Sequence, residues 1–150
     1  MKILFPFYWF IVTCRSTPTE VLTKLSKNEN AKVRMLIASH PNTSEEVLSE
    51  LSKDANHDVR WEVARNPNTS AEALARLSRD SSVHVRLSVA CNLNTSAETL
   101  AKLSKDCFIH VRLSVVCNLN TPIEVLTELS EDEYGMIGEF AKYELERRNK

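Results

Sequence analysis

The residues best suited to chemistry in this 150-residue chain are two histidine–cysteine pairs with the same spacing. Cys91 follows His84 by seven residues, and Cys117 follows His110 by the same interval. Imidazole and thiolate are zinc ligands, and a thiol beside a histidine can also be a nucleophile with its base. Seven residues span about 10 Å of helix, however, whereas zinc ligands lie about 2.0–2.3 Å from the metal. We therefore expect no metal and no other cofactor.

Composition excludes several other classes of site. The chain has only two glycines, Gly135 and Gly138, whereas phosphate-binding loops and dinucleotide fingerprints need several glycines in one turn. The net charge of −1, from 19 basic and 20 acidic residues, provides no general field for phosphate backbones. Serines and paired acids such as Glu45 and Glu46 fall at repeated positions or helix starts. We expect that the protein is not an enzyme and that nucleic acid is not its partner.

A repeat of 26 residues organises these side chains. Val-Arg begins at 33, 59, 85 and 111, and Leu-Ser begins at 25, 51, 77, 103 and 129. Such a period, with helical apolar spacing and without glycine turns, indicates an all-α solenoid of two-helix units. The predicted units are 16–41, 42–67, 68–93, 94–119 and a degenerate, capping 120–145. An apolar segment, 1–15, precedes them, and a charged tail, 146–150, follows.

Local signals mark where the helices of each unit begin and end. A threonine followed three residues later by glutamate, as in Thr69 and Glu72, is a capping-box signature and predicts that threonine caps the first helix. Asn66, Asn92 and Asn118 are expected to end the second helices in the left-handed conformation. The second segment of each unit is predicted as a helix, and a short or 3-10 form of it is left open.

The second helices also carry a row of charges. An arginine recurs in the first four units, and an aspartate precedes three of these arginines by six residues. Acid and base repeating at the stacking period predict a ladder of paired charges between units, in preference to a row of phosphate-binding arginines. The ladder residues are Arg34, Arg60, Arg86 and Arg112 with Asp54, Asp80 and Asp106.

The unit resembles a known repeat family. The stretch NPNTSAEALARLSRD, followed by VRLSVA, resembles the leucine-rich repeat variant family, and its second half is similar to a HEAT repeat. This resemblance covers about 130 residues of the chain and implies a right-handed, armadillo-like superhelix. It implies a scaffold but no single function, because such repeats occur in unrelated proteins. One type of family member carries an N-terminal iron–sulfur segment, which one cysteine before the repeats, Cys14, cannot supply.

A second apolar row marks the candidate binding surface. Met35, Trp61, Leu87 and Leu113 lie on the opposite side of the second helices from the core valines. Burial within the solenoid is the favoured interpretation of this row, and an exposed groove anchored by Trp61 is the alternative. The candidate protein-binding residues are Trp61, Arg65, Leu87, Cys91, Leu113 and Cys117.

Three functions remain open at this point. The favoured one is a cytoplasmic scaffold that binds an unidentified protein, since four cysteines without a CxxC pair fit free thiols in a reducing compartment. A second is an exported scaffold tethered to a membrane through Cys14, if residues 1–13 are a signal and not a plug or a passenger. A third is a reader of nucleic-acid backbones. An open end of the solenoid also offers a route to oligomers.

Overall fold

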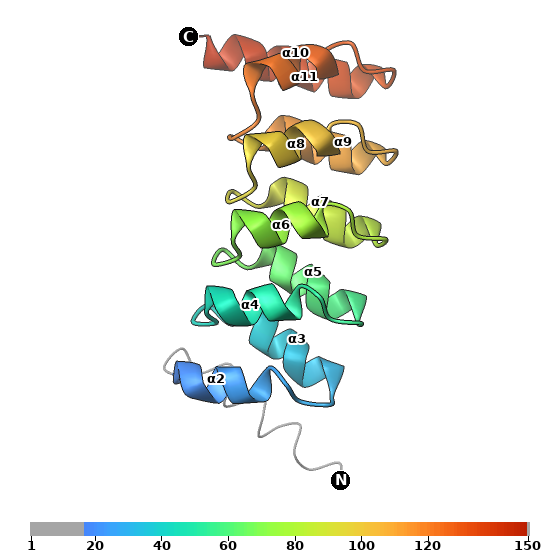
Figure 1. Cartoon of the computed structure of the whole chain (residues 1–150). Helices are drawn as coiled ribbons and strands as arrows, with labels where there is room; N and C mark the ends of the chain where they lie inside the picture. Colours follow the sequence, from blue (N-terminus) through green and yellow to red (C-terminus); the bar gives the residue numbers. More distant parts are fainter. Residues whose placement is uncertain (1–16, 150) are drawn as a thin grey trace.

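The computed structural model describes residues 17–149 and consists of two layers of short helices (Figure 1). One layer contains the first helix of each unit: α2 (Thr19–Leu25), α4 (Glu45–Leu51), α6 (Ala71–Leu77), α8 (Ala97–Leu103) and α10 (Ile123–Leu129). The other contains the second helices: α3 (Ala31–Ser39), α5 (His57–Arg65), α7 (Val83–Cys91), α9 (Ile109–Cys117) and α11 (Gly135–Arg148). The described part of the chain has no strand. The predicted all-α solenoid is therefore confirmed.

The second helices are α-helices and are longer than the first helices. Four of them are α-helices of 9 residues, and α11 has 14, whereas each first helix has 7. In the described units the second helices are therefore α-helical and short in the first four units, and the 3-10 alternative is not the form they take. Each second helix stacks on the next, α3 on α5, α5 on α7, α7 on α9 and α9 on α11, so this layer is continuous along the array.

The core lies between the two layers. Leucines of the first helices, such as Leu74 and Leu77, meet valines of the second helices, such as Val85 and Val89, and all four are at most 1% exposed. The i, i+3 and i, i+4 spacings place these side chains on the faces that meet. Because each unit repeats this pattern, one continuous core runs from Leu22 to Ala141.

The start of each first helix differs from the predicted capping box. In the three central units the cap is the serine after the threonine, and Ser70 Oγ accepts a hydrogen bond from the Ala73 amide at 3.4 Å. Pro18 and Pro122 occupy this position in the first and last units. The threonine is instead buried, and Thr69 Oγ1 donates to the Val63 carbonyl at 2.6 Å. Its hydroxyl therefore joins a first helix to the end of the preceding second helix.

The ends of the second helices also differ from expectation. Asn66, Asn92 and Asn118 have φ between −71° and −77° and extended backbones, and no described residue, glycine included, has positive φ. The left-handed ending predicted for these asparagines was therefore wrong. Their side chains bond to the neighbouring unit, which the local sequence does not reveal.

Candidate functional site

A ladder of arginine–aspartate pairs runs along the array. Each arginine pairs with the aspartate side chain of the following unit and not with the aspartate six residues before it. Arg86 donates through Nε and Nη2 to both oxygens of Asp106, at 2.7 and 3.2 Å, in the next unit. The aspartate six residues before it, Asp80, contributes its backbone carbonyl, which Arg86 Nη1 reaches at 2.9 Å. The same fork joins Arg34 to Asp54, Arg60 to Asp80, and Arg112 to Asp132. Each arginine therefore links two units.

The ladder aspartates are held in their charged form. The hydrogen bond from Arg34 lowers the pKa of Asp54, and the hydrogen bond from Arg112 does the same for Asp132. At Asp80 burial raises the pKa, but the arginine hydrogen bond and backbone amides outweigh burial, so the net shift is also downward. Each ladder carboxylate is at most 8% exposed and engaged by its arginine, so little of the ladder is available to a ligand.

A second ladder is made of the buried asparagines. Asn92 Nδ2 donates to the carbonyls of Ala64 and Asn66, at 2.8 and 3.1 Å, and Asn92 Oδ1 accepts from the Asn94 amide at 2.9 Å. Asn66 and Asn118 make the equivalent bonds to their own preceding units. Both amide hydrogens and the amide oxygen form hydrogen bonds within the array. These side chains therefore join neighbouring units and are not available to bind a ligand.

The exposed part of the second helices is a groove that follows the row of Trp61, Leu87 and Leu113. These three side chains are half-buried and pack against the core with one face, and they line open pockets with the other. The row is thus half-buried. This result lies between the two interpretations from sequence, burial within the solenoid and an exposed groove. We call this surface the second-helix groove.

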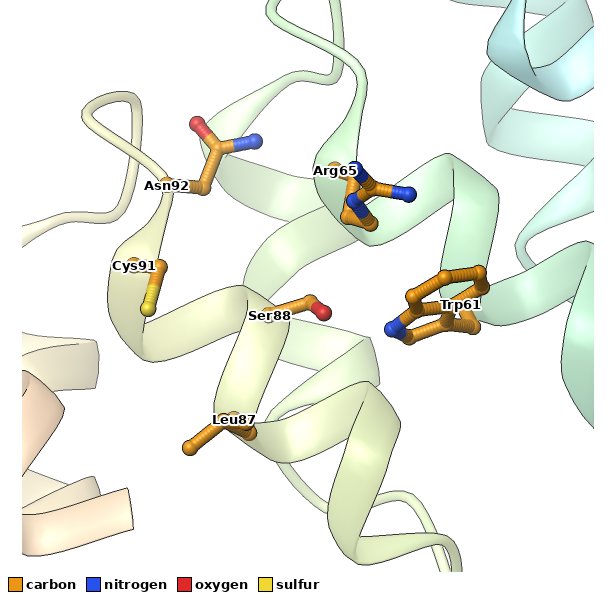
Figure 2. Close-up of a pocket in the computed structure, with 6 residues that line it drawn as sticks. All are labelled: Trp61, Arg65, Leu87, Ser88, Cys91 and Asn92. Atoms are coloured by element: carbon orange, nitrogen blue, oxygen red, sulfur yellow. The ribbon is translucent and has the colours of Figure 1, made fainter. Parts of the chain in front are cut away.

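The largest opening of the groove is a pocket of about 440 Å³ between α5 and α7 (Figure 2). Trp61 and Arg65 line it from α5, and Leu87, Ser88 and Cys91 line it from α7. The Arg65 guanidinium lies over the Trp61 ring, 4.6 Å from its centroid, which is a cation–π distance. Figure 2 shows the indole nitrogen of Trp61 and the hydroxyl of Ser88 pointing toward each other across the opening.

The electrostatics of this pocket depend on Arg65 and Glu62. Arg65 Nη1 lies 3.6 Å from Glu62 Oε2, and the Glu62 side chain is 16% exposed. Burial raises the pKa of Glu62, although the charge of Arg65 opposes the shift. Glu62 lines the adjacent pocket with Ser39 and Asn66, not the one containing Trp61. Arg65 therefore has an acid on one side and the open pocket on the other.

A second pocket, of about 270 Å³, lies one unit further along, between α7 and α9. It is lined by Cys91, Leu93, Leu113, Ser114 and Cys117. Burial raises the pKa of the Cys117 thiol, and Glu144 and Cys91 add to the shift, so this thiol stays protonated. This pocket presents sulfur and aliphatic surface where the first pocket presents an aromatic ring and a cation.

The structure brings all six candidate binding residues to the two pockets of this groove. Ser88, which follows Leu87 in the repeat and is a rim position of the groove from sequence, lines the first pocket with them. Sequence reasoning missed Asp132 in the ladder, although Asp132 lies 26 residues after Asp106. Strict use of the period would have found Asp132.

The remaining candidate chemistry is not assembled in the described residues. No group of three or more histidine, cysteine or acidic side chains in residues 17–149 could hold a metal ion. Cys91, Cys107 and Cys117 are free and exposed. None of the described helices combines the length and the apolar character needed to cross a membrane. Residues 1–15 and Cys14, which carry the plug, passenger and signal alternatives, lie outside the described residues.

Comparison with known proteins identifies the repeat. Residues 57–82 match the family model of the leucine rich repeat variant. A solved leucine-rich repeat variant, described as having a novel repetitive protein structural motif, superposes with a TM-score of 0.71 and 23% identity over 90% of this chain. That alignment covers 54% of the solved chain, so this chain spans about half its length. No curated protein gives a significant match. Residues 57–82 are thus similar to the leucine rich repeat variant, and the described chain has the α-solenoid fold of the solved repeat protein.

Proposed function

We propose that the protein is a non-catalytic scaffold that binds another protein along the second-helix groove. The proposal is supported by a contrast between polar side chains that bond within the array and polar side chains that line an open pocket. The ladder arginines and asparagines are paired within the array, whereas Trp61, Arg65 and Ser88 converge on an open pocket. Half-buried tryptophan beside arginine is the composition of protein-binding hot spots.

Several features favour a protein partner over other ligands. Arg65 is the one cation that lines the two pockets of the groove, and the other residues that line them are neutral. The groove therefore lacks the series of positive charges that binding of a phosphate backbone requires. The arginines that could have formed such a series are bound to aspartates. We also propose a cytoplasmic location, which the exposed free thiols support because reducing compartments keep such thiols unpaired.

Co-purification from cells of the source organism tests the proposal. The chain carries a C-terminal tag, and Trp61→Ala is compared with wild type and with Ile123→Ala. Ile123 is a matched control because it is an apolar side chain, 48% exposed, on α10 in the other layer. Circular dichroism and thermal melting first establish that all three proteins are folded.

A partner that Ile123→Ala retains and Trp61→Ala loses at least tenfold is the expected result, because truncating a hot-spot tryptophan costs about 2 kcal/mol or more. A partner captured equally by all three proteins would contradict the groove as the binding surface.

A further inference from the structure

The helix α11, at the C-terminal end of the array (Figure 1), is apolar on two sides. One side carries Ile137 and Ala141, which are fully buried in the core. The other side carries Met136, Phe140 and Tyr143, which are 52%, 47% and 62% exposed. α11 packs on α9 and α10, and these contacts leave the second side open. We call Met136, Phe140 and Tyr143 the α11 seam.

The repeat itself does not require large apolar side chains at the seam positions. The seam stands 26 residues after a row of α9 that has no large apolar member, made of His110, Ser114 and Cys117. The unit therefore folds with small or polar side chains at these positions. Because packing within the array does not account for the three large side chains, their grouping on one exposed face indicates a contact with another molecule.

The spacing of the seam is that of a surface that pairs with another helix. The three seam residues and Arg147 follow one another at intervals of four, three and four residues, as in a coiled coil. At 3.6 residues per turn, these four side chains lie within about 60° around the α11 axis and extend over about three turns. A helix with such a row packs along the length of a second helix.

The row reads nearly the same in both directions about its central residue, Phe140. Met136 lies four residues before Phe140 and Tyr143 lies three after it. Glu133 lies seven residues before Phe140, and Arg147 lies seven after it. In an antiparallel pair of α11 helices centred on Phe140, the two phenylalanine rings therefore meet, and each methionine sulfur faces a tyrosine ring of the other chain. Ring–ring and sulfur–aromatic contacts of this kind are favourable.

The charges at the two ends of the row match a second copy of the same helix. The Glu133 side chain is 81% exposed and lies 4.0 Å from Arg112. The Arg147 side chain is 48% exposed and pairs with Glu144 of the same helix. An antiparallel partner places acid opposite base at both ends of the seam, whereas a parallel partner places like charges opposite each other. Exposed pairs of this kind contribute little affinity, but they select the orientation.

We infer that the protein forms a two-fold symmetric dimer, in which the α11 seam packs antiparallel against the same seam of a second copy. Both chains use the same surface, so the association closes at two subunits. One helix from each chain makes a small interface, and we expect a dissociation constant in the micromolar range. This inference goes beyond the proposed function, because the seam lies on α11 and the pocket that contains Trp61 lies between α5 and α7.

Sedimentation equilibrium of the full chain tests the inference. We expect the mass to rise from the 17.0 kDa of one chain toward twice that value between about 1 and about 500 μM. Phe140→Ser removes both rings at the symmetry axis and is expected to weaken the dimer about tenfold. Phe108→Ser is the matched control and keeps the dimer, because Phe108 is 48% exposed and precedes α9. Trp61→Ala also keeps the dimer, so dimer formation and groove binding are measured separately.

A charge exchange tests the direction of the helix pair. Glu133→Arg and Arg147→Glu each place like charges opposite each other, so each variant alone is expected to dimerise about tenfold more weakly than wild type. An equimolar mixture of the two variants is expected to recover the wild-type affinity, because each arginine of one chain then faces a glutamate of the other. Circular dichroism first establishes that every variant is folded.

Several outcomes overturn the inference. A wild-type chain that stays monomeric up to about 500 μM excludes the dimer. A dimer that Phe140→Ser leaves unchanged, or that Phe108→Ser weakens equally, uses another surface. A mixture of the charge variants that associates as weakly as its components excludes the antiparallel pair, and this test remains decisive if Phe140→Ser does not fold. Particles that grow beyond two chains would indicate end-to-end stacking and not a closed pair.

Discussion

At the scale of single residues, the array is held by polar side chains that each bond to two units. Arg86 is a representative case, because its guanidinium bonds both to the Asp80 carbonyl in its own unit and to the Asp106 carboxylate in the next. Asn92 acts in the same way through buried amide bonds. Removing one partner of such a bond leaves the other buried and unpaired, and this costs more than the bond itself contributes.

Arg86→Gln tests the charged ladder. The change leaves Asp106 with the Phe108 amide and the weak Cys107 thiol donor but no cation, so we expect the free energy of unfolding in urea to fall by about 3 kcal/mol at pH 7. The control is Lys102→Gln, which breaks the exposed pair with Glu98 and is expected to cost less than about 0.5 kcal/mol. Equal losses in the two variants would mean that the ladder contributes no more than a surface pair.

The ladder also sets the acid stability. The pKa of Asp106 is lowered in the fold, since bonds from Arg86 and the Phe108 amide outweigh the opposing effect of burial. Stability from this shift is therefore present above about pH 4 and is lost as the pH falls below that value. We expect the difference between wild type and Arg86→Gln to shrink between pH 5 and pH 3, measured by urea unfolding. A difference in unfolding free energy that stays constant between pH 5 and pH 3 would contradict a stabilising role for ionised Asp106.

Asn92→Ala tests the asparagine ladder. The substitution removes the partner of the Ala64 carbonyl and of the Asn94 amide, while the Asn66 carbonyl keeps the Thr69 amide, so we expect a loss of about 3 kcal/mol in unfolding free energy. Leu93→Ala changes the adjacent exposed residue and is expected to be nearly neutral. A neutral Asn92→Ala would show that water replaces the side chain without cost.

At the scale of helices, the regular units follow from their pattern, and the last unit departs from it. Gly138 of α11 occupies the position that Arg112 occupies in α9, 26 residues earlier. A Cβ on Gly138 would lie 2.8 Å from the Ser130 carbonyl oxygen. The missing side chain thus lets α11 approach the end of α10, where earlier units place an arginine.

The two glycines of α11 form a matched pair for testing this approach. Alanine is favoured over glycine in helices by about 1 kcal/mol, so Gly135→Ala, which meets no atom within 4 Å, is expected to be neutral or stabilising. Gly138→Ala is expected to destabilise by about 1–3 kcal/mol, because it forces the helix away from Ser130. Both are measured by thermal and urea unfolding, and a stabilised Gly138→Ala would contradict the close approach.

The helices could be predicted from sequence more completely than their ends could. Leucines and valines at helical spacing suffice to place both helices of a unit. The choice between Thr69 and Ser70 as cap could not be made locally, because both residue types cap helices well. The choice is decided by the Val63 carbonyl, which lies across a turn and binds the threonine. The asparagine bonds span 26–28 residues and are invisible to any local rule.

The second-helix groove was predictable from sequence only in part. Trp61, Leu87 and Leu113 recur at the repeat period and could be found as a row. Whether their outer face was covered depended on the neighbouring helices, which leave it open as a pair of pockets.

At the scale of the whole molecule, the far end of the array is closed by one side chain. Arg148 donates to the Thr121 carbonyl at 2.6 Å and to the Asn118 carbonyl at 2.9 Å. The equivalent carbonyls in earlier units, those of Thr69 and Asn66, accept from asparagines of the following unit. Arg148 therefore donates to the two carbonyls that asparagines of a following unit bind elsewhere in the array.

Arg148→Ala tests this closure. We expect faster amide hydrogen exchange in the last two turns of α11 and a loss of about 2 kcal/mol, since hydrogen bonds from a charged donor contribute about 1.5–3 kcal/mol. Arg147→Ala is the control, because Arg147 pairs only with Glu144 at the surface and its side chain is 48% exposed. An equal rise in hydrogen exchange in both variants would mean that the loss of one positive charge from α11 causes the effect. The hydrogen bonds of Arg148 to the Thr121 and Asn118 carbonyls would then not be its cause.

We propose the second-helix groove as the binding surface, and the natural cysteines test this proposal within one molecule. Cys91 and Cys107 are both exposed; Cys91 lines the groove and Cys107 precedes α9 in the loop from α8. The measurement is the alkylation rate of each thiol by mass spectrometry, in cells and in the purified chain. We expect Cys91 to react at least tenfold more slowly in cells relative to Cys107. An unchanged ratio, or selective protection of Cys107, would contradict the account.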